Sequence, residues 1–396
     1  MIRIILKKGR DESLRRYHPW VFSGAVAQVQ GSPAEGDIVA VYSAEGDCLA
    51  CGHWQIGSIA VRILSFDSDP TAPGFWTDAI QRALDVRRAA LQGGTPLTNC
   101  FRLVHGEGDG LPGLIVDWYD GVCVMQAHSV GMFRAKMQIC EALKNVFADS
   151  LKAVYDKSSG TAPFKAGLEL IDGYIYKAPG FTGSEQTVLE NGNKFIVNWE
   201  EGQKTGFFLD QRDNRALVGK YAAGRSVLNL FCYTGGFSVY ALNAGALSVD
   251  SVDSSAKAMM LVDRNVALTG RADSHKSICA DAIEYLNSVE AGKYDLIIVD
   301  PPAFAKHRGA LKNALRAYQR LNAAAIRKVA PGGLVFTFSC SQVVDKITFA
   351  NTVFSAAAQT GRSVRILDRL CQGADHPVSI YHPEGEYLKG LLLYVE

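Results

Sequence analysis

The chain has 396 residues, 48% of them hydrophobic, which is enough to bury more than one core and suggests two or three domains. No apolar run approaches the ~20 residues that span a bilayer, and the first twenty residues lack a signal-peptide core, so we expect a cytoplasmic protein without membrane contact. Nine scattered cysteines favour reduced thiols over a disulfide framework, and a formal net charge of +1 does not indicate any one class of partner.

Residues 1 to about 70 are predicted to form short strands separated by Gly, Asp and Ser turns, and thus a small β-rich module. Cys48 and Cys51 form the only C-x-x-C pair, but no further zinc ligands lie nearby, so we interpret them as strand residues. The predicted strands are Ile2–Leu6, Ile38–Tyr42, Cys48–His53 and Ala60–Leu64.

A middle α+β region follows a Pro-containing break and ends near Pro179. The glycines at 106, 108 and 110 favour a hairpin turn within Phe101–Tyr119, because no helix follows them to form a phosphate site. The other predicted elements are a helix over Phe75–Leu91, a strand over Val122–Ala127, a helix over Met132–Phe147 and a strand over Ala153–Asp156.

From about Gly183 the pattern changes to apolar strands that alternate with helices, which predicts a mostly parallel sheet covered on both faces. The predicted strands are Val227–Phe231, Ser248–Val252, Ser277–Cys279, Leu296–Val299, Leu334–Phe338, Val364–Leu367 and Leu391–Val395. The predicted helices are Phe237–Asn243, Ala256–Leu268, Ala282–Ser288, Arg308–Val329 and Asp345–Thr360.

The segment Ser226–Ser238 has the pattern of a nucleotide-cofactor loop. A buried strand breaks at Gly235 and Gly236 and restarts as a helix, whose first N–H groups can face a ligand. The third glycine of the dinucleotide fingerprint is missing, which counts against a nicotinamide cofactor. Asp253 ends the next strand, where a carboxylate can accept hydrogen bonds from ribose hydroxyls. Ribose without pyrophosphate favours S-adenosylmethionine as the cofactor.

Other strand ends place further polar groups at the same edge of the predicted sheet. Asp281 follows the third strand, and Asp300 follows the fourth. Pro301 and Pro302 cannot extend a helix, so they hold the chain open and present the Asp300 carboxyl to a pocket.

The fifth strand brings Cys340 to this edge, where a thiol has a specific use. C5 of a pyrimidine is a poor nucleophile, but attack of a thiolate at C6 makes C5 electron-rich. An enzyme must therefore supply a nucleophile and a hydrogen-bonding acid near N3. Cys340 and Asp300 are the candidate catalytic residues for these two roles.

Two basic clusters suggest contact with phosphates. Residues 1–20 hold six Lys or Arg against two acidic residues, and residues 301–344 hold seven and none. Four of the latter recur every four residues, which predicts one basic stripe along a helix. The candidate RNA-binding residues are Lys7, Lys8, Arg10, Arg308, Lys312, Arg316 and Arg320.

Several motifs resemble the RlmI-type bacterial 23S rRNA (cytosine-C5) methyltransferases. These motifs are HPWVFSGAV (His18–Val26), TGFFLDQRDNR (Thr205–Arg215), NLFCYTGGFSVYAL (Asn229–Leu242), VDPPAF (Val299–Phe304), TFSCS (Thr337–Ser341), DHPV (Asp375–Val378) and YHPEGEYLKG (Tyr381–Gly390). The resemblance covers nearly the whole chain and implies an S-adenosylmethionine-dependent enzyme that makes 5-methylcytosine in 23S rRNA or a large-subunit precursor.

The resemblance also implies the domain organisation and the cofactor site. We expect a β-rich PUA-like RNA-binding barrel over residues 1–72, an α+β middle domain over 73–182 and a class I (Rossmann-like) α/β methyltransferase domain over 183–396. The cofactor residues carried over by motif are Lys204, Thr205, Phe208, Gln211, Arg212, Asn229, Tyr233, Gly235, Asp253, Asp281 and Asp300. No metal is expected, and a homodimer is left open.

The sequence departs from related double-cysteine enzymes at one position. Ala303 stands where RNA cytosine methyltransferases of that group have a second cysteine, so release of the product from Cys340 is unassigned. The base that removes the C5 proton is also unassigned, with His307 and Asp210 as candidates.

Three other functions stay open at this point. The motif DPPAF also resembles the signature of base-nitrogen methyltransferases, which need no thiol. A non-catalytic ribosome assembly factor would use the PUA-like module and the basic stripe. A nicotinamide oxidoreductase is the third, and the missing glycine counts against it. The sequence identifies neither the modified nucleotide nor whether naked rRNA or an assembled particle is the substrate.

Overall fold

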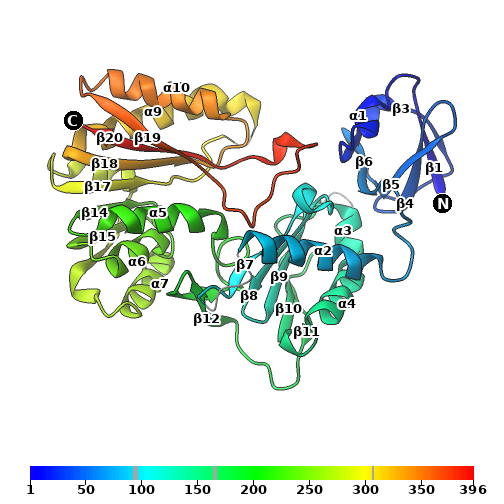
Figure 1. The fold of residues 1–396 in the computed structure, drawn as a ribbon, viewed down its shortest axis with the longest axis horizontal. Coiled ribbons are helices and arrows are strands. Elements are labelled where there is room, and N and C mark those ends of the chain that lie inside the picture. The colour runs from blue at the N-terminus through cyan, green and yellow to red at the C-terminus, as the bar shows by residue number, and fades with distance from the viewer. Residues whose placement is uncertain (92–96, 164–166, 306) are drawn as a thin grey trace. The chain divides into compact units, whose positions relative to one another are not determined.

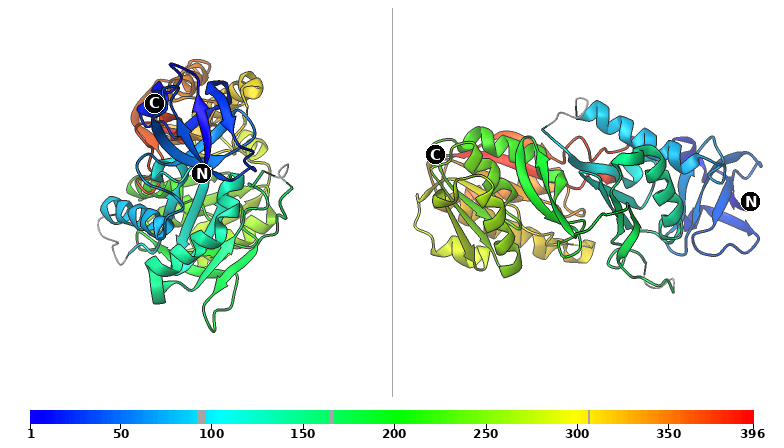
Figure 2. Two further views of the ribbon diagram at one scale, coloured as in Figure 1. Left: turned by 90° about the vertical axis from the view of Figure 1, so that its right-hand side faces the viewer. Right: turned by 90° about the horizontal axis from the view of Figure 1, so that it is seen from below.

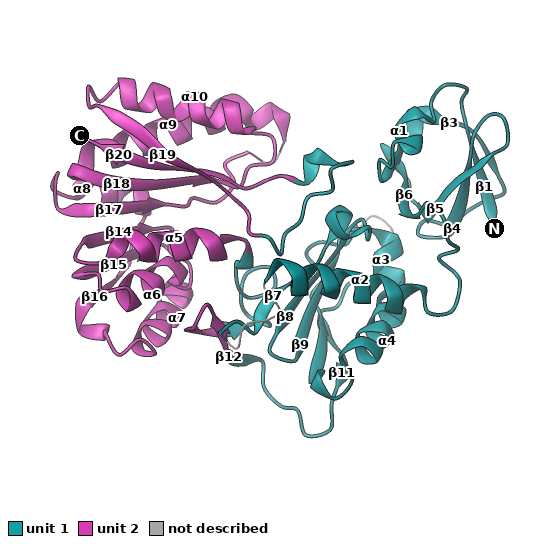
Figure 3. Cartoon of the chain, in the orientation of Figure 1, with its two compact units in different colours: residues 1–186, 197–209, 374–385 teal, residues 187–196, 210–373, 386–396 magenta. Residues whose placement is uncertain are grey.

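The structure is a computed structural model that describes residues 1–91, 97–163, 167–305 and 307–396. The chain divides into two compact units (Figure 3). Unit 1 comprises residues 1–186, 197–209 and 374–385, and unit 2 comprises residues 187–196, 210–373 and 386–396. The predicted division into three domains, with boundaries at 72/73 and 182/183, stays a prediction. Among the described residues, every helix is too short or too polar to cross a lipid bilayer.

Unit 1 begins with a six-stranded sheet in the order β2-β6-β5-β4-β1-β3. Its apolar side chains, such as Ile4, Val41 and Val61, are fully buried in one core. Two strands, β2 and β3, were not predicted from the sequence: β2 has only three residues, and β3 is largely exposed. The elements are β1 (Ile2–Leu6), α1 (Glu12–Arg15), β2 (Trp20–Phe22), β3 (Val26–Gln30), β4 (Ile38–Tyr42), β5 (Cys48–Trp54) and β6 (Ile59–Ser65).

A second sheet of unit 1 has five strands in the order β11-β10-β9-β8-β7. Helices α2 and α4 contribute to its core through residues such as Ile80 and Leu143. The predicted hairpin is confirmed, because β7 and β8 pair antiparallel around a 3-10 turn at Gly106–Asp109. The elements are α2 (Phe75–Ala90), β7 (Cys100–His105), β8 (Leu114–Tyr119), β9 (Val122–Ala127), α3 (Val130–Arg134), α4 (Lys136–Phe147), β10 (Ala153–Asp156) and β11 (Gly173–Lys177).

Unit 2 is built on a seven-stranded sheet in the order β16-β15-β14-β17-β18-β20-β19. The first five strands run parallel, and β20 pairs antiparallel with both β18 and β19. The predicted, mostly parallel sheet is therefore confirmed. The strands are β14 (Ser226–Leu230), β15 (Ser248–Asp253), β16 (His275–Cys279), β17 (Tyr294–Val299), β18 (Val329–Ser339), β19 (Val364–Cys371) and β20 (Lys389–Val395).

Helices cover both faces of this sheet (Figures 1 and 2). Alternate residues of one strand enter different cores: Leu228 and Leu230 pack with α8, α9 and α10, whereas Val227 packs with α5, α6 and α7. This alternation is what a strand buried on both faces requires. The helices are α5 (Arg212–Ala222), α6 (Gly236–Asn243), α7 (Ala256–Ala267), α8 (Ala282–Ser288), α9 (Leu311–Lys328) and α10 (Lys346–Ala358).

Some predicted elements differ from the structure. The helix predicted from Arg308 begins only at Leu311, because Arg308–Ala310 forms a 3-10 turn. The helix predicted from Met132 is two helices, α3 and α4, that meet at Ala135. Helix α5 and the two-stranded sheet formed by β12 (Glu185–Glu190) and β13 (Asn193–Asn198) were not predicted from the sequence.

Candidate functional site

The carboxyl ends of five parallel strands define the candidate site in unit 2. The chain leaves β14 for β15 and β16 on one side and later returns to β17 on the other side of β14. Such a reversal leaves a crevice at the carboxyl ends of β14 and β17, where ligands bind in open α/β sheets. The predicted loop after β14 and the predicted Asp300 after β17 lie at these two ends.

The loop between β14 and α6 has an unusual backbone. Phe231 and Tyr233 have φ angles of 57° and 47°, and Gly235 has a φ of 80°. A left-handed backbone conformation is strained for a bulky residue. Such strained residues are found most often at active sites and ligand-binding loops. A Cβ at Gly235 would also lie 3.2 Å from a methyl group of Val262, so glycine fits both the turn and the space.

Asp253, the last residue of β15, holds this loop in place. One carboxylate oxygen accepts a hydrogen bond from the Tyr233 N–H at 3.0 Å, and the other accepts one from the Ser255 N–H at 2.9 Å. The side chain is partly exposed, so its oxygens can accept further hydrogen bonds from a ligand. The predicted cofactor loop and the predicted acidic partner are thus in direct contact.

Two other predicted residues have local contacts of their own. Asn229 is fully buried and donates from Nδ2 to the Ser238 hydroxyl at 2.8 Å, which fixes it between β14 and α6. Asp281 caps α8, where one carboxylate oxygen accepts from the N–H groups of Ile283 and Glu284, both at 2.9 Å.

Asp300 directly follows β17, ahead of Pro301 and Pro302. Its carboxylate accepts a hydrogen bond from Gln211 Nε2 at 3.0 Å, and Gln211 Oε1 accepts from Asn214 Nδ2 at 2.6 Å. The structure therefore joins two residues predicted separately, Gln211 from the motif TGFFLDQRDNR and Asp300 from the strand end. Arg212 is buried at 2% exposure, next to Gln211 at the start of α5.

Cys340 follows the last residue of β18 and is partly exposed. Its Sγ lies 4.0 Å from the carbonyl oxygen of Pro301, so the thiol and the Asp300–Pro302 loop are adjacent. Cys232, within the cofactor loop, is buried. Burial raises the pKa of Cys232 well above the ordinary thiol range, and the charge of Asp253 raises it further. All nine cysteines are free thiols, as predicted.

The residue after Cys340 anchors it to the helical layer. The Ser341 hydroxyl lies 2.9 Å from the Tyr318 hydroxyl on α9 and accepts a hydrogen bond from the Ala305 N–H at 3.3 Å. Burial raises the pKa of Tyr318, so its hydroxyl stays protonated. These contacts tie the Cys340 backbone to the segment after Asp300.

A buried lysine, which the sequence analysis did not single out, lies at the same end of the sheet. Lys389 begins β20 and pairs with Ser339 of β18. Its side chain is 4% exposed, and its ammonium donates to the carbonyl oxygens of Ser341 at 2.7 Å and Val344 at 2.6 Å. Burial lowers the pKa of Lys389 to about 8.

Three predicted cofactor residues belong to unit 1. The Thr205 hydroxyl donates to buried Asp117 at 2.5 Å, and Asp117 in turn accepts from Arg102. Lys204 is exposed, with its ammonium 4.7 Å from the centre of the Phe208 ring. Their contact with a cofactor stays a prediction.

The predicted RNA-binding residues are exposed on both units. Lys312, Arg316 and Arg320 lie on α9 at four-residue spacing, and this part of the stripe has helical geometry. Arg308 lies in the preceding 3-10 turn, outside α9, which corrects the prediction of a four-residue helical stripe. The exposed residues are Lys7, Lys8 and Arg10 in unit 1, and Arg308, Lys312, Arg316 and Arg320 in unit 2.

The two candidate bases differ in environment. His307 is exposed and precedes the 3-10 turn at Arg308. Asp210 is 7% exposed and accepts a hydrogen bond from the Tyr387 hydroxyl at 2.6 Å. A role as the catalytic base stays a prediction for both residues.

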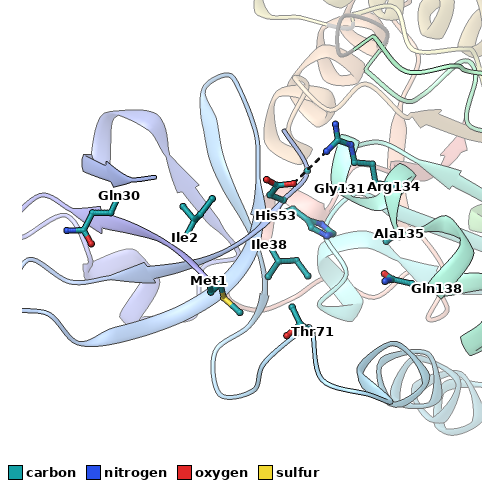
Figure 4. A pocket seen from close by; sticks show the side chains of 12 residues that line it. Met1, Ile2, Gln30, Ile38, His53, Thr71, Gly131, Arg134, Ala135 and Gln138 are labelled. Carbon is teal, nitrogen blue, oxygen red and sulfur yellow. Dashed lines mark ion pairs between the residues drawn. The ribbon is translucent and has the colours of Figure 1, made fainter. Parts of the chain in front are cut away.

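A separate pocket of about 780 Å³ lies within unit 1 (Figure 4). Arg134 and Asp37 form an ion pair of 3.7 Å across its lining, which also includes Met1, Ile38 and buried His53. Burial lowers the pKa of His53 to about 4, so its ring is neutral at physiological pH. No residue predicted for catalysis or cofactor binding lines this pocket.

One cluster of potential metal ligands occurs within the described part of the chain. The ligand atoms of His18, His382 and Glu384 lie within 4.8 Å of one another in unit 1. Three ligands are one short of a closed structural zinc site. This cluster could not be predicted from the sequence, because its members come from opposite ends of the chain.

Family models match two regions of the chain. A model described as S-adenosylmethionine-dependent methyltransferase matches residues 101–392. A model described as PUA-like domain matches residues 4–66. Together they cover both the predicted N-terminal module and the candidate site.

Curated relatives match the chain over its full length. Ribosomal RNA large subunit methyltransferase I of Shewanella amazonensis is 40% identical, covering 100% of this chain and 99% of the relative. The protein of the same name from Pseudoalteromonas atlantica is 41% identical, covering 99% of each.

Solved structures show the same fold at lower identity. The crystal structure of SMU.776 complexed with SAH has a TM-score of 0.84 at 22% identity and covers 100% of both chains. A tRNA m1G37 methyltransferase of M. jannaschii has a TM-score of 0.51 at 17% identity, covering 72% of this chain and 76% of that one. At these identities the likeness concerns the fold alone.

Proposed function

Because this chain belongs to the ribosomal RNA large subunit methyltransferase I family, we propose that it methylates C5 of a cytosine in 23S rRNA through a covalent adduct of Cys340. The family is S-adenosylmethionine-dependent and acts on rRNA. The base, the ring position and the covalent step are the finer parts of the proposal. They are supported by the arrangement of side chains at the strand ends of unit 2.

The strand ends suit S-adenosylmethionine, which supplies an electrophilic methyl group when bound. Asp253 offers partly exposed carboxylate oxygens for ribose hydroxyls, and Gly235 allows the sharp turn that brings the loop to Asp253. Both features fit a nucleoside without pyrophosphate. The residues of unit 2 that we propose for the cofactor are Gln211, Arg212, Asn229, Tyr233, Gly235, Asp253, Asp281 and Asp300.

Cys340 is proposed as the nucleophile. Its thiolate sulfur forms a bond to C6 of the cytosine, and the ring electrons shift to C5, which then accepts the methyl group. Loss of the C5 proton to a base and cleavage of the S–C6 bond restore the aromatic ring and the thiolate. Asp300, in its carboxylic acid form, would hydrogen-bond near N3 and stabilise the negative charge that attack at C6 produces.

The contrast between two cysteines is the observation on which the proposal depends. Cys340 is partly exposed and lies beside the Asp300–Pro302 loop, where a flipped base could reach its sulfur. Cys232 is buried with a raised pKa, which makes it a poor nucleophile. Nucleophilic cysteines are partly exposed and polar in environment, and only Cys340 of this pair meets that description.

The basic residues would place the RNA. We propose that Lys7, Lys8 and Arg10, together with Lys312, Arg316 and Arg320, contact phosphates, which supply most of the salt-dependent affinity for nucleic acid. Base recognition would come from the groups around Cys340. A substrate bound by several exposed cations should dissociate readily as the salt concentration rises.

Nucleoside mass spectrometry tests the proposed reaction. Protein and S-adenosylmethionine are added to 23S rRNA from cells that lack the gene, and the digested RNA is compared with an untreated sample. We expect one new 5-methylcytosine. A new base-nitrogen methyl group would replace the proposal with the nitrogen methyltransferase, and rRNA binding without any methylation would favour the assembly factor.

A further inference from the structure

Lys389 brings a cation to the end of β18 where Cys340 lies. It pairs directly across from Ser339, the residue before Cys340, in the antiparallel β18–β20 ladder. Its ammonium then reaches past Cys340 to the carbonyl oxygens of Ser341 and Val344, at 2.7 and 2.6 Å. The lysine thus contacts the chain on both sides of the thiol.

This ammonium is buried without an acidic partner. In the described part of the chain, no carboxylate forms an ion pair with Lys389, and its side chain is 4% exposed. A buried cation that meets only carbonyl oxygens is costly to desolvate, and its lowered pKa of about 8 reflects this cost. A neutral donor could form hydrogen bonds with the same carbonyl oxygens at a smaller desolvation cost. The hydrogen bonds alone therefore do not explain why this buried side chain is a cation.

The other charged groups around Lys389 are engaged elsewhere. Glu386 pairs with the exposed Lys346 at 2.5 Å. Asp345 caps α10, accepting from the Thr348 N–H at 2.7 Å. Cys340 heads the groups whose negative charge would favour the charged form of Lys389, ahead of Asp345 and Glu386. The negative charge of a Cys340 thiolate is therefore the one that the ammonium would stabilise most.

We propose that Lys389 is a positioning residue, whose buried ammonium keeps the sulfur of Cys340 in the thiolate form and holds it toward the base-binding side of the sheet. This role rests on the proposed function, because only the formation of a C6 adduct requires Cys340 as a thiolate. Lys389 itself does not touch the substrate: it acts through the charge it sets beside the sulfur and through the carbonyls it binds.

Alkylation of Cys340 as a function of pH tests this role without RNA or cofactor. Iodoacetamide reacts with the thiolate, and mass spectrometry of the Cys340 peptide separates it from the other eight cysteines. We expect the pH midpoint of alkylation to rise by about 1 unit or more in Lys389→Gln and Lys389→Met, because an opposite charge that favours the thiolate is lost. Lys389→Arg should stay within about 0.3 units of the wild type.

The variants separate charge from structure. Gln can still donate to a carbonyl, so a merely structural lysine predicts that Lys389→Gln keeps the wild-type midpoint, and this result would overturn the proposal. A midpoint in Lys389→Arg raised as far as in Lys389→Gln would overturn it as well. Lys346→Gln is the matched control, because Lys346 is a nearby but exposed lysine whose charge is screened by solvent. Thermal melting checks that each variant is folded.

The role of Lys389 and the covalent mechanism can be refuted independently. If Cys340→Ala retained full methylation, the covalent route would be wrong while the alkylation midpoints stayed as measured. If the midpoints did not depend on the charge at position 389, the role of Lys389 would be wrong while the covalent route could still hold.

Discussion

Each unit of the molecule buries a basic side chain, but the two are stabilised in different ways. In unit 1, Arg87 is 1% exposed and forms a fork-like ion pair with Asp109, with further hydrogen bonds to the carbonyl oxygens of Arg102 at 2.7 Å and Asp375 at 2.9 Å. In unit 2, the Lys389 ammonium donates to two carbonyl oxygens and forms no ion pair with a carboxylate among the described residues.

The difference shows how a structural cation can be told from one with a chemical task. The charge of Arg87 is neutralised by the Asp109 carboxylate. Its hydrogen bonds join three segments of unit 1, and this structural role is enough to explain its burial. Lys389 has no ion-pair partner among the described residues, and it lies at the edge of the sheet where the ends of β17 and β18 present Asp300 and Cys340. An uncompensated buried charge beside a candidate nucleophile is a feature typical of functional sites.

The largest expected effect is the loss of methylation activity when Cys340, the thiol beside Lys389, is replaced. Cys340→Ala should lower kcat/KM for rRNA methylation by about 10⁴-fold or more, because loss of a covalent nucleophile removes the whole route. Cys232→Ala, the control in the buried loop, should lower it by less than about tenfold. Steady-state methylation assays measure both, and equal activities of the two variants would remove the reason for a cation at position 389.

The stability of each unit tests the comparison directly. Arg87→Met leaves Asp109 buried and uncompensated, which should cost about 3–5 kcal/mol in unit 1. Lys389→Met leaves two carbonyl oxygens without a donor but also removes a desolvated charge, so its cost in unit 2 should not exceed about 1–3 kcal/mol. Amide hydrogen exchange of peptides from each unit reports these values. A larger cost for Lys389→Met would contradict the contrast.

The pH dependence of stability should separate the two cations further. The pKa of Lys389 is about 8 in the folded protein and ordinarily about 10.4, so between these values the unfolded state binds more protons. The stability of the wild type relative to Lys389→Met should therefore increase as the pH rises from about 8 to about 10.4. Urea denaturation of unit 2 measures this difference, and a flat or falling difference would mean that the charged form of Lys389 is not disfavoured by folding.

The smallest expected effect is on the salt dependence of RNA binding. It concerns the exposed cations, which can be compared with the two buried ones. Replacing Lys312, Arg316 and Arg320 together by Gln should reduce the slope of log binding constant against log salt concentration by about 2, at ~0.7 per single-stranded phosphate. Protein stability should change little, because these side chains are solvated. The control replaces the exposed Lys220 and Lys276. An unchanged slope in the triple variant would exclude the stripe from the RNA-binding surface.

The strand ends of unit 2 could be predicted because their causes are local. A continuous apolar run followed by Gly or Pro predicts a buried parallel strand and its end, and the structure confirms this pattern at β14 and β17. The N-cap roles of Asp281 and Asp345 likewise depend only on neighbouring residues. Asp253 at the end of β15 was predicted for the same reason.

The remaining features depend on contacts distant in sequence. Helix α5 was missed because it has many polar residues, and its buried Arg215 is explained only by an ion pair with Glu190 at 2.7 Å. The bond from Gln211 to Asp300 and the burial of Lys389 likewise arise from tertiary packing. No periodicity or spacing rule indicates that a lysine at the start of a strand will be enclosed.

Trapping with a fluorinated base tests the central claim most directly. When 23S rRNA contains 5-fluorocytidine, the C5 fluorine cannot leave as a proton does, so a sulfur adduct at C6 persists after methyl transfer. The account predicts a denaturant-stable protein–RNA adduct that maps to Cys340 and is absent from Cys340→Ala. Methylation of ordinary rRNA by Cys340→Ala at the wild-type rate, or an adduct at another residue, would contradict it.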